Sequence, residues 1–218
     1  MIFAVITILI IIQVSPANRT AAAKGSKRPS VEYVPDSSSP GSPVLEGASW
    51  VVEHERYTAR LTRLDDAGRR AFLVEKAGAF TDPFASTDPR SVGFLTFLLE
   101  LESRTEGTLV FQPQNCILVT NRKEFRYPLD LPTIESSFGL LEQEVPQSYR
   151  QARPALFDGE RVLLRGERAS GLLVYRGIDA KTRSFVVEFQ LTTPQGKVVG
   201  FTSTYKRLKK KNKKKEAP

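Results

Sequence analysis

The sequence predicts an all-β fold, an antiparallel β-sandwich with one short crossing helix. Residues 94–102 and 184–191 alternate between apolar and polar side chains, which is typical of strands buried on one face. Further apolar runs of strand length recur from residue 57 to residue 205, separated by turn-forming residues. Only residues 133–157 break this pattern, because Gly and β-branched residues become fewer there.

Ordered structure is expected to begin near Trp50. A first strand is predicted at residues 57–62, followed by a turn at residues 65–68 and a second short strand at residues 71–75. Two Asp-Pro steps in residues 79–91 predict a loop before the strongest central strand, which covers residues 94–102.

The second half of the chain continues the sheet. A strand is expected at residues 109–111, and residues 116–120 and 125–127 are expected to form a hairpin. Pro146 and Pro154 delimit a short helix at residues 147–152, since proline suits the first turn and ends a helix. Strands resume at residue 162 and end near residue 205, with a turn at residues 193–196.

Composition divides the chain into four parts. Residues 1–17 carry no charge and are mostly apolar, which predicts a signal peptide or a short membrane segment. Residues 18–47 are rich in Ala, Ser, Pro and Lys and predict a disordered linker. Residues 48–205 form the predicted sandwich domain, and residues 206–218 form a polybasic disordered tail.

The N-terminal segment predicts export to the periplasm, the cell envelope or the medium. Ser15 and Ala17 are small residues at the positions that an export peptidase reads. No Lys or Arg precedes the apolar run, so a membrane anchor formed by residues 1–17 is the alternative. The basic residues that follow an anchor would then favour a cytoplasmic location for the domain.

The net charge of +8 is concentrated at the C-terminus. Residues 206–218 contain eight basic residues and one acidic residue, so the rest of the chain is close to neutral. A nearly neutral domain is not typical of a dedicated nucleic-acid-binding protein. The tail predicts binding to an anionic surface through Lys206, Arg207, Lys209, Lys210, Lys211, Lys213, Lys214 and Lys215. A solubilising tail without a partner is the alternative.

The run from residue 164 to residue 175 resembles a signature of telokin-like, immunoglobulin-like domains of exported bacterial proteins. That signature reads leucine, proline, glycine, glutamate, then glycine, then valine-phenylalanine; here Gly166-Glu167 and Val174-Tyr175 match parts of it. The resemblance implies an immunoglobulin-like sandwich and a binding or stress-related envelope protein without catalytic residues. Arg165 stands where proline is usual, and no cysteine follows the apolar N-terminus to carry the family's lipid anchor.

Catalytic chemistry is not expected. His54 is the only histidine and lies among charged residues at a strand edge, which is typical of a solvated surface. Glu100 and Glu102 lie about 7 Å apart on one strand face, a spacing compatible with paired-carboxylate catalysis. Alternation with leucine places them on the solvent side, so a structural role is favoured. Asp65 and Asp66 lack the ligand spacing of a calcium loop.

Cys116 begins an apolar strand and is expected to be a small buried residue. If it were exposed after export, an intermolecular disulfide would be the alternative. A single cysteine excludes an intrachain disulfide and a cysteine-based zinc cluster. We therefore predict no cofactor, no metal and no small-molecule substrate.

The predicted function is a non-enzymatic, exported or envelope-associated module that binds a protein or an anionic envelope polymer or lipid, and no specific nucleic acid. Phe138, Leu140 and Leu141 form the expected protein-contact patch. A membrane-anchored protein that faces the cell interior and uses its lysine tail on anionic lipid is the alternative. A hydrolase with a hidden site is the least favoured hypothesis.

Overall fold

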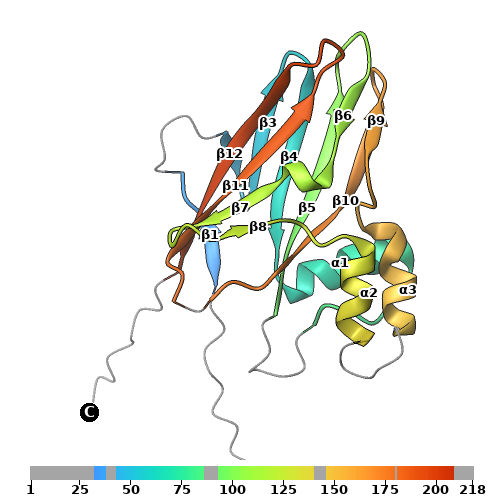
Figure 1. Cartoon of the computed structure of the whole chain (residues 1–218), viewed down its shortest axis with the longest axis vertical. Coiled ribbons are helices and arrows are strands. Elements are labelled where there is room, and N and C mark those ends of the chain that lie inside the picture. Colours follow the sequence, from blue (N-terminus) through green and yellow to red (C-terminus); the bar gives the residue numbers. More distant parts are fainter. Residues whose placement is uncertain (1–31, 38–42, 86–92, 140–145, 180, 209–218) are drawn as a thin grey trace, which may run out of the picture.

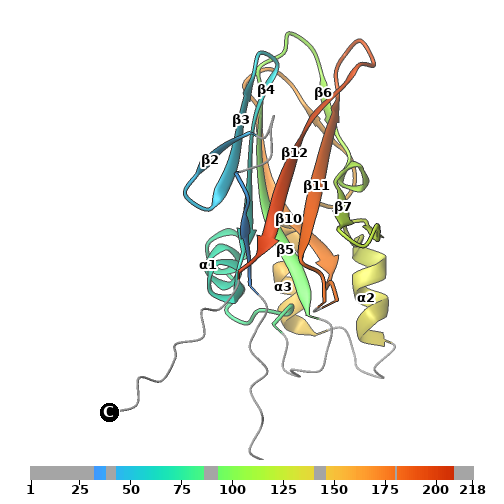
Figure 2. The same cartoon turned by 90° about the vertical axis from the view of Figure 1, so that its left-hand side faces the viewer.

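The computed structural model describes residues 32–37, 43–85, 93–139, 146–179 and 181–208. Two antiparallel sheets pack face to face, and three α-helices gather at the lower end of the long strands in both views (Figures 1 and 2). The all-β sandwich is therefore confirmed, whereas the expectation of one helix is wrong.

The first sheet has the order β1-β12-β11-β6-β9, and β7 pairs with both β11 and β8. Its strands are β1 (Tyr33–Pro35), β6 (Leu109–Phe111), β7 (Ile117–Thr120), β8 (Phe125–Arg126), β9 (Arg161–Leu163), β11 (Ser184–Thr192) and β12 (Val198–Arg207). The inward phase predicted for β11 is confirmed, because all four of its apolar members are buried: Phe185, Val187, Phe189 and Leu191.

The second sheet has the order β10-β5-β4-β3-β2. Its strands are β2 (Val44–Glu46), β3 (Ser49–His54), β4 (Tyr57–Leu64), β5 (Phe94–Ser103) and β10 (Arg168–Arg176). β5 is the predicted central strand and lies between β10 and β4. Between the sheets, Phe97 packs edge to face against Tyr175 at 5.7 Å and Tyr205 at 5.4 Å, a favourable geometry for aromatic rings.

Three α-helices pack on the outer face of the second sheet: α1 (Asp66–Ala77), α2 (Leu131–Gly139) and α3 (Gln147–Ala152). The 3₁₀ helix η2 (Arg153–Ala155) follows α3, and η1 (Pro113–Asn115) lies next to β11 of the first sheet. Leu73 of α1 and Tyr149 of α3 are buried in one apolar cluster with Leu172 and Val174 of β10. α3 matches the predicted helix at residues 147–152, and Pro146 is its N-cap.

The strand predicted at residues 71–75 is wrong, because these residues belong to α1. Asp65 caps this helix by accepting a hydrogen bond of 2.7 Å from the Gly68 backbone N–H. Gly78 ends it in the left-handed conformation with φ of 61°. Arg69 and Leu73 are buried at helical spacing, so tertiary packing overrides the local preference of the apolar run for a strand.

Two strands lie inside the segment that composition predicted to be a linker. Tyr33 of β1 pairs with Arg207 of β12 and is only 5% exposed, and β2 pairs with β3. The domain therefore begins before residue 48, and β12 includes Lys206 and Arg207, which were expected in the tail. Strands of three residues are too short to show a periodic pattern in the sequence. They form because partner strands supply their backbone hydrogen bonds.

Candidate anion-binding surface

The two ends of the described chain lie side by side at one end of the first sheet (Figure 1). The backbone N–H of Leu208 donates a hydrogen bond of 2.8 Å to the carbonyl oxygen of Glu32. On the other side of β12, Lys206 pairs with Ser184, the first residue of β11. The segments before residue 32 and after residue 208 therefore attach at neighbouring points of the domain.

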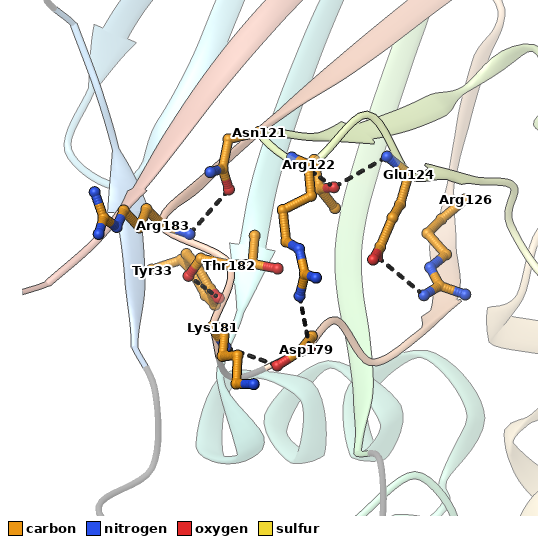
Figure 3. A network of polar contacts seen from close by, with 10 residues as sticks. Tyr33, Asn121, Arg122, Glu124, Arg126, Asp179, Lys181, Thr182 and Arg183 are labelled. Atoms are coloured by element: carbon orange, nitrogen blue, oxygen red, sulfur yellow. Dashed lines mark hydrogen bonds and ion pairs between the residues drawn. The ribbon is translucent and has the colours of Figure 1, made fainter.

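The turn between β7 and β8 joins this end through a polar network (Figure 3). Asn121 Oδ1 accepts a hydrogen bond of 3.0 Å from the backbone N–H of Arg183, which precedes β11. Arg122 Nη1 donates to Asp179 Oδ2 at 2.9 Å, so the turn is also bound to the β10–β11 loop. These contacts hold residues in place that are about sixty positions apart in the sequence.

Tyr33 links the chain ends to the core. Its ring packs edge to face on Phe185 at 5.1 Å, and its hydroxyl donates to the Thr182 carbonyl oxygen at 3.0 Å. Its own carbonyl oxygen accepts a hydrogen bond of 2.9 Å from Arg63 Nη1 of the second sheet. Burial raises the pKa of the Tyr33 phenol and lowers the pKa of the Arg63 guanidinium. β1 is thus tied to both layers.

Cations outnumber carboxylates at this end of the molecule. We call it the basic end, and its cations are Arg122, Lys123, Arg126, Arg176, Lys181, Arg183, Lys206 and Arg207. Its carboxylates are Glu32, Asp36, Glu124, Asp130 and Asp179. Three of these carboxylates form ion pairs, in which Arg122 binds Asp179, Arg126 binds Glu124 and Lys206 binds Asp36. An excess of positive charge remains.

Four of the cations form no ion pair with any carboxylate of the described residues. All four are exposed: Lys123, Arg176, Lys181 and Arg183. The backbone N–H of Lys181, together with the Arg122 guanidinium, lowers the pKa of Asp179 and so favours its ionised form. Asp179 therefore organises the loop, and the charge of Lys181 also acts on it. The side chains of Lys181 and Arg183 are exposed to solvent.

An open hollow of about 380 Å³ lies next to β8. Its walls combine exposed aromatic side chains with cations, including Phe125, Tyr127, Arg126 and Arg176. Asp130 also lines it and caps α2, where hydrogen bonds from Thr133 lower the pKa of the Asp130 carboxyl. Because an ionised carboxylate faces the hollow, it does not suit a small free anion, although its rim suits a broader anionic surface.

His54 stabilises the turn between β3 and β4. Its Nδ1 accepts a hydrogen bond of 3.1 Å from the Arg56 backbone N–H, and its ring stacks on Tyr57 at 4.9 Å. These contacts close the turn between β3 and β4. The side chain is half-buried rather than fully solvated, so the predicted environment is wrong in that respect.

The predicted carboxylates are dispersed over the fold. Glu100 and Glu102 lie on the outer face of the second sheet, as expected, and Glu102 binds Arg168 at 2.9 Å. Asp65 caps α1 and Asp66 binds Arg69, so both belong to a helix start rather than to a turn. Among the described residues, no three His, Cys, Asp or Glu side chains come together to hold a metal ion.

Cys116 is fully buried, as predicted. Its carbonyl oxygen accepts a hydrogen bond of 3.0 Å from the Tyr175 hydroxyl, and burial raises the pKa of its thiol well above the ordinary value. A buried, protonated thiol is a poor nucleophile. The alternative of an exposed cysteine that forms an intermolecular disulfide is therefore wrong for the folded domain.

Several predicted residues lie outside the described structure. They are Lys209, Lys210, Lys211, Lys213, Lys214 and Lys215 of the tail, residues 1–17, Leu140, Leu141 and the side chain of Phe138. In the described segments, no helix has the length and apolar character to cross a membrane.

Sequence reasoning missed the cations that lie near the end of β12. Arg122 and Lys123 stand in a turn, and Lys181 and Arg183 stand immediately before a strand. Both pairs flank strands of the same sheet, at the end where β12 finishes. Sequence reasoning could find this only with the strand order, and no local pattern in the sequence gives that order.

Comparisons with known proteins do not assign a family. No protein-family model and no curated protein matches the chain. Among solved structures, the yjhA protein from Bacillus subtilis is similar with a TM-score of 0.37 and 8% identity, over 64% of this chain and 76% of that chain. A similarity at this level identifies neither family nor function. The resemblance to telokin-like, immunoglobulin-like domains therefore stays a prediction.

Proposed function

We propose that this protein is a non-enzymatic β-sandwich module of the cell envelope that binds an anionic partner through its basic end and its C-terminal tail. The observation that carries this proposal is the position of Arg207, which pairs with Tyr33 at the end of the first sheet. Arg183 and Arg122 lie in the adjoining segments. The lysines that follow Leu208 in the sequence are therefore joined to an end of the domain that is already positive.

The charge distribution supports reversible electrostatic binding. Each Lys or Arg near an anionic lipid surface contributes about 1 kcal/mol, and less when the side chain stays mobile. A small number of cations held by the fold, joined to a lysine-rich tail, supplies enough attraction for binding that salt screens. Anionic envelope polymers offer the same charge chemistry, so the proposal covers both kinds of partner.

The dispersion of reactive side chains supports a non-enzymatic role. His54 closes a turn of the second sheet, Glu102 is bound to Arg168, and Cys116 is buried inside the sandwich. Nucleophilic and acid–base catalysis require such groups within hydrogen-bond reach of one another. In the described segments these three side chains serve separate structural contacts instead.

Deletion of residues 209–218 tests the proposal and leaves β12 intact. We expect the full chain to bind anionic vesicles or an anionic polymer at low salt, and the deletion variant to bind more weakly. High salt should reduce the binding of both proteins. Binding that is unaffected by salt and by the deletion would contradict an electrostatic role for the tail.

A further inference from the structure

We infer that the β7–β8 turn and its flanking aromatic residues contact an anionic phospholipid membrane directly, so that the basic end faces the bilayer. This inference rests on the proposed function and names its ligand. It assigns a role to Lys123, Lys181, Phe125 and Tyr127, which lie outside the tail and would contact lipid while the tail supplies additional charge.

Lys123 occupies an unfavourable backbone conformation at the tip of this turn. Its φ is 61°, and among the described residues it is the one non-glycine with positive φ. Glycine adopts this conformation without steric cost, and asparagine does so more readily than lysine. The turn geometry therefore favours glycine or asparagine, and the lysine places an exposed charge at the tip of the turn.

Aromatic side chains line the adjoining hollow together with Arg126 and Arg176. Phe125 is 61% exposed and Tyr127 is 54% exposed, although both are large apolar residues. Phe125 pairs with Val119, which pairs in turn with Val186, so the three share the outer face of the first sheet. Exposed aromatic and apolar side chains beside Lys and Arg form the pattern that suits the headgroup region of a bilayer.

The path of the chain favours lipid over other anionic partners. Residues 2–12 are apolar except for Thr7, and residues 13–31 join them to Glu32 at the basic end. A fully extended chain of that length spans at most about 70 Å. An apolar run that enters a membrane would thus be joined to the domain at its basic end, where the exposed aromatic side chains and cations lie.

Tryptophan reporters test the orientation. In the full chain, Phe125→Trp places an indole on the inferred contact surface. Val198→Trp places a matched control at the far end of the first sheet, where Val198 is 56% exposed. With vesicles of phosphatidylglycerol and phosphatidylcholine, we expect an emission blue shift for Phe125→Trp and none for Val198→Trp. The native Trp50 is fully buried and contributes a constant background.

Charge variants test which cations contribute. We expect Lys123→Gly combined with Lys181→Gln to lower affinity for these vesicles about tenfold. The glycine removes the positive-φ penalty, so an unchanged or higher melting temperature shows that lost binding does not come from unfolding. Arg104→Gln combined with Lys197→Gln removes the same charge at the opposite end and should keep full affinity.

The outcomes separate this inference from the proposed function. If deletion of residues 209–218 weakens binding while the Lys123 and Lys181 variant and the Phe125 reporter show no effect, the tail acts alone and the inference is wrong. If vesicles of phosphatidylcholine alone bind as well as the anionic vesicles, the proposed function itself fails. Equal blue shifts at Phe125 and Val198, or binding of DNA but not of vesicles, would also overturn the inference.

Discussion

Arg69 Nη2 of α1 lies 2.7 Å from the carboxylate of Asp82, and both side chains are at most 2% exposed. Arg69 also binds Asp66 at 2.8 Å and Thr96 of β5 at 3.3 Å. This buried guanidinium therefore fastens the first helix and the following loop to the outer face of the second sheet. Removing one partner of a buried ion pair strongly destabilises the fold, because the other charge stays buried without a partner.

We therefore expect Arg69→Met to lower the free energy of unfolding by about 3–5 kcal/mol. The measurement is equilibrium unfolding in urea. Arg70→Met is the matched control, because Arg70 is the adjacent exposed arginine of α1 and should change stability by less than about 0.5 kcal/mol. Equal effects of the two substitutions would show that the Arg69–Asp82 pair has no special importance.

Tyr33 is expected to anchor β1 despite its position in a polar segment. Tyr33→Ala removes a buried ring that packs on Phe185, so the free energy of unfolding should fall by about 3 kcal/mol. Tyr33→Phe removes only the hydrogen bond to the Thr182 carbonyl oxygen and should cost about 1 kcal/mol. Tyr127→Ala, at an exposed tyrosine, serves as the control in the same denaturant titration. A stability loss below 1 kcal/mol for Tyr33→Ala would contradict the anchoring role of β1.

Alkaline pH should destabilise the helical end of the domain. Burial raises the pKa of Tyr149 from 10.0 to about 12, and the Tyr149 hydroxyl lies 3.4 Å from the Leu131 carbonyl oxygen. Between these two pH values the phenol is ionised in the unfolded chain but still protonated in the folded one. The stabilisation is therefore complete below pH 10.0 and is lost as the pH rises toward 12.

Urea unfolding measured across this pH range checks the alkaline prediction. Tyr149→Phe should lower stability at neutral pH, because it removes a buried hydroxyl contact, but its stability should fall less steeply above pH 10.0 than that of the unmodified chain. Parallel slopes in the two proteins would mean that Tyr149 does not contribute to alkaline unfolding.

Cys116 is expected to be unreactive while the domain is folded. The thiol is buried and its pKa is raised, so an aromatic disulfide reagent should modify it only through transient opening of the core. The measurement is the modification rate in buffer compared with the rate in denaturant, which should be faster by orders of magnitude. Rapid modification in buffer, or a disulfide-linked dimer, would contradict the buried position.

Alternation predicted the long strands because it depends only on neighbouring residues. The sequence of β5 and β10 also contains a second indication, which the prediction did not use. Leu98 stands in the outward phase of β5, and Leu172 and Val174 stand in the outward phase of β10, where polar residues would face water. Apolar residues in both phases indicate a strand covered on both faces, and here the cover is provided by the helices.

Only part of the helical end was predicted, because sequence patterns report on neighbouring residues and not on packing. Pro146 marked the start of α3, because proline restricts its own backbone wherever it occurs. α1 was missed because the apolar run at residues 72–74 resembles a strand, although Asp65 and Gly78 stand at the cap positions of a helix.

By itself the sequence determined the inward phase of the strands, the buried cysteine and the position of the lysine tail, since these depend on residues close together in the chain. Only the tertiary structure decided that Lys123, Lys181 and Arg183 lie at the end of the sheet where β12 finishes. The physical reason is register: Thr120 pairs with Phe185, and Phe185 with Tyr205, so turns distant in sequence meet at one end of the first sheet. Backbone pairing between distant strands leaves no local pattern, and the contact surface depends on it.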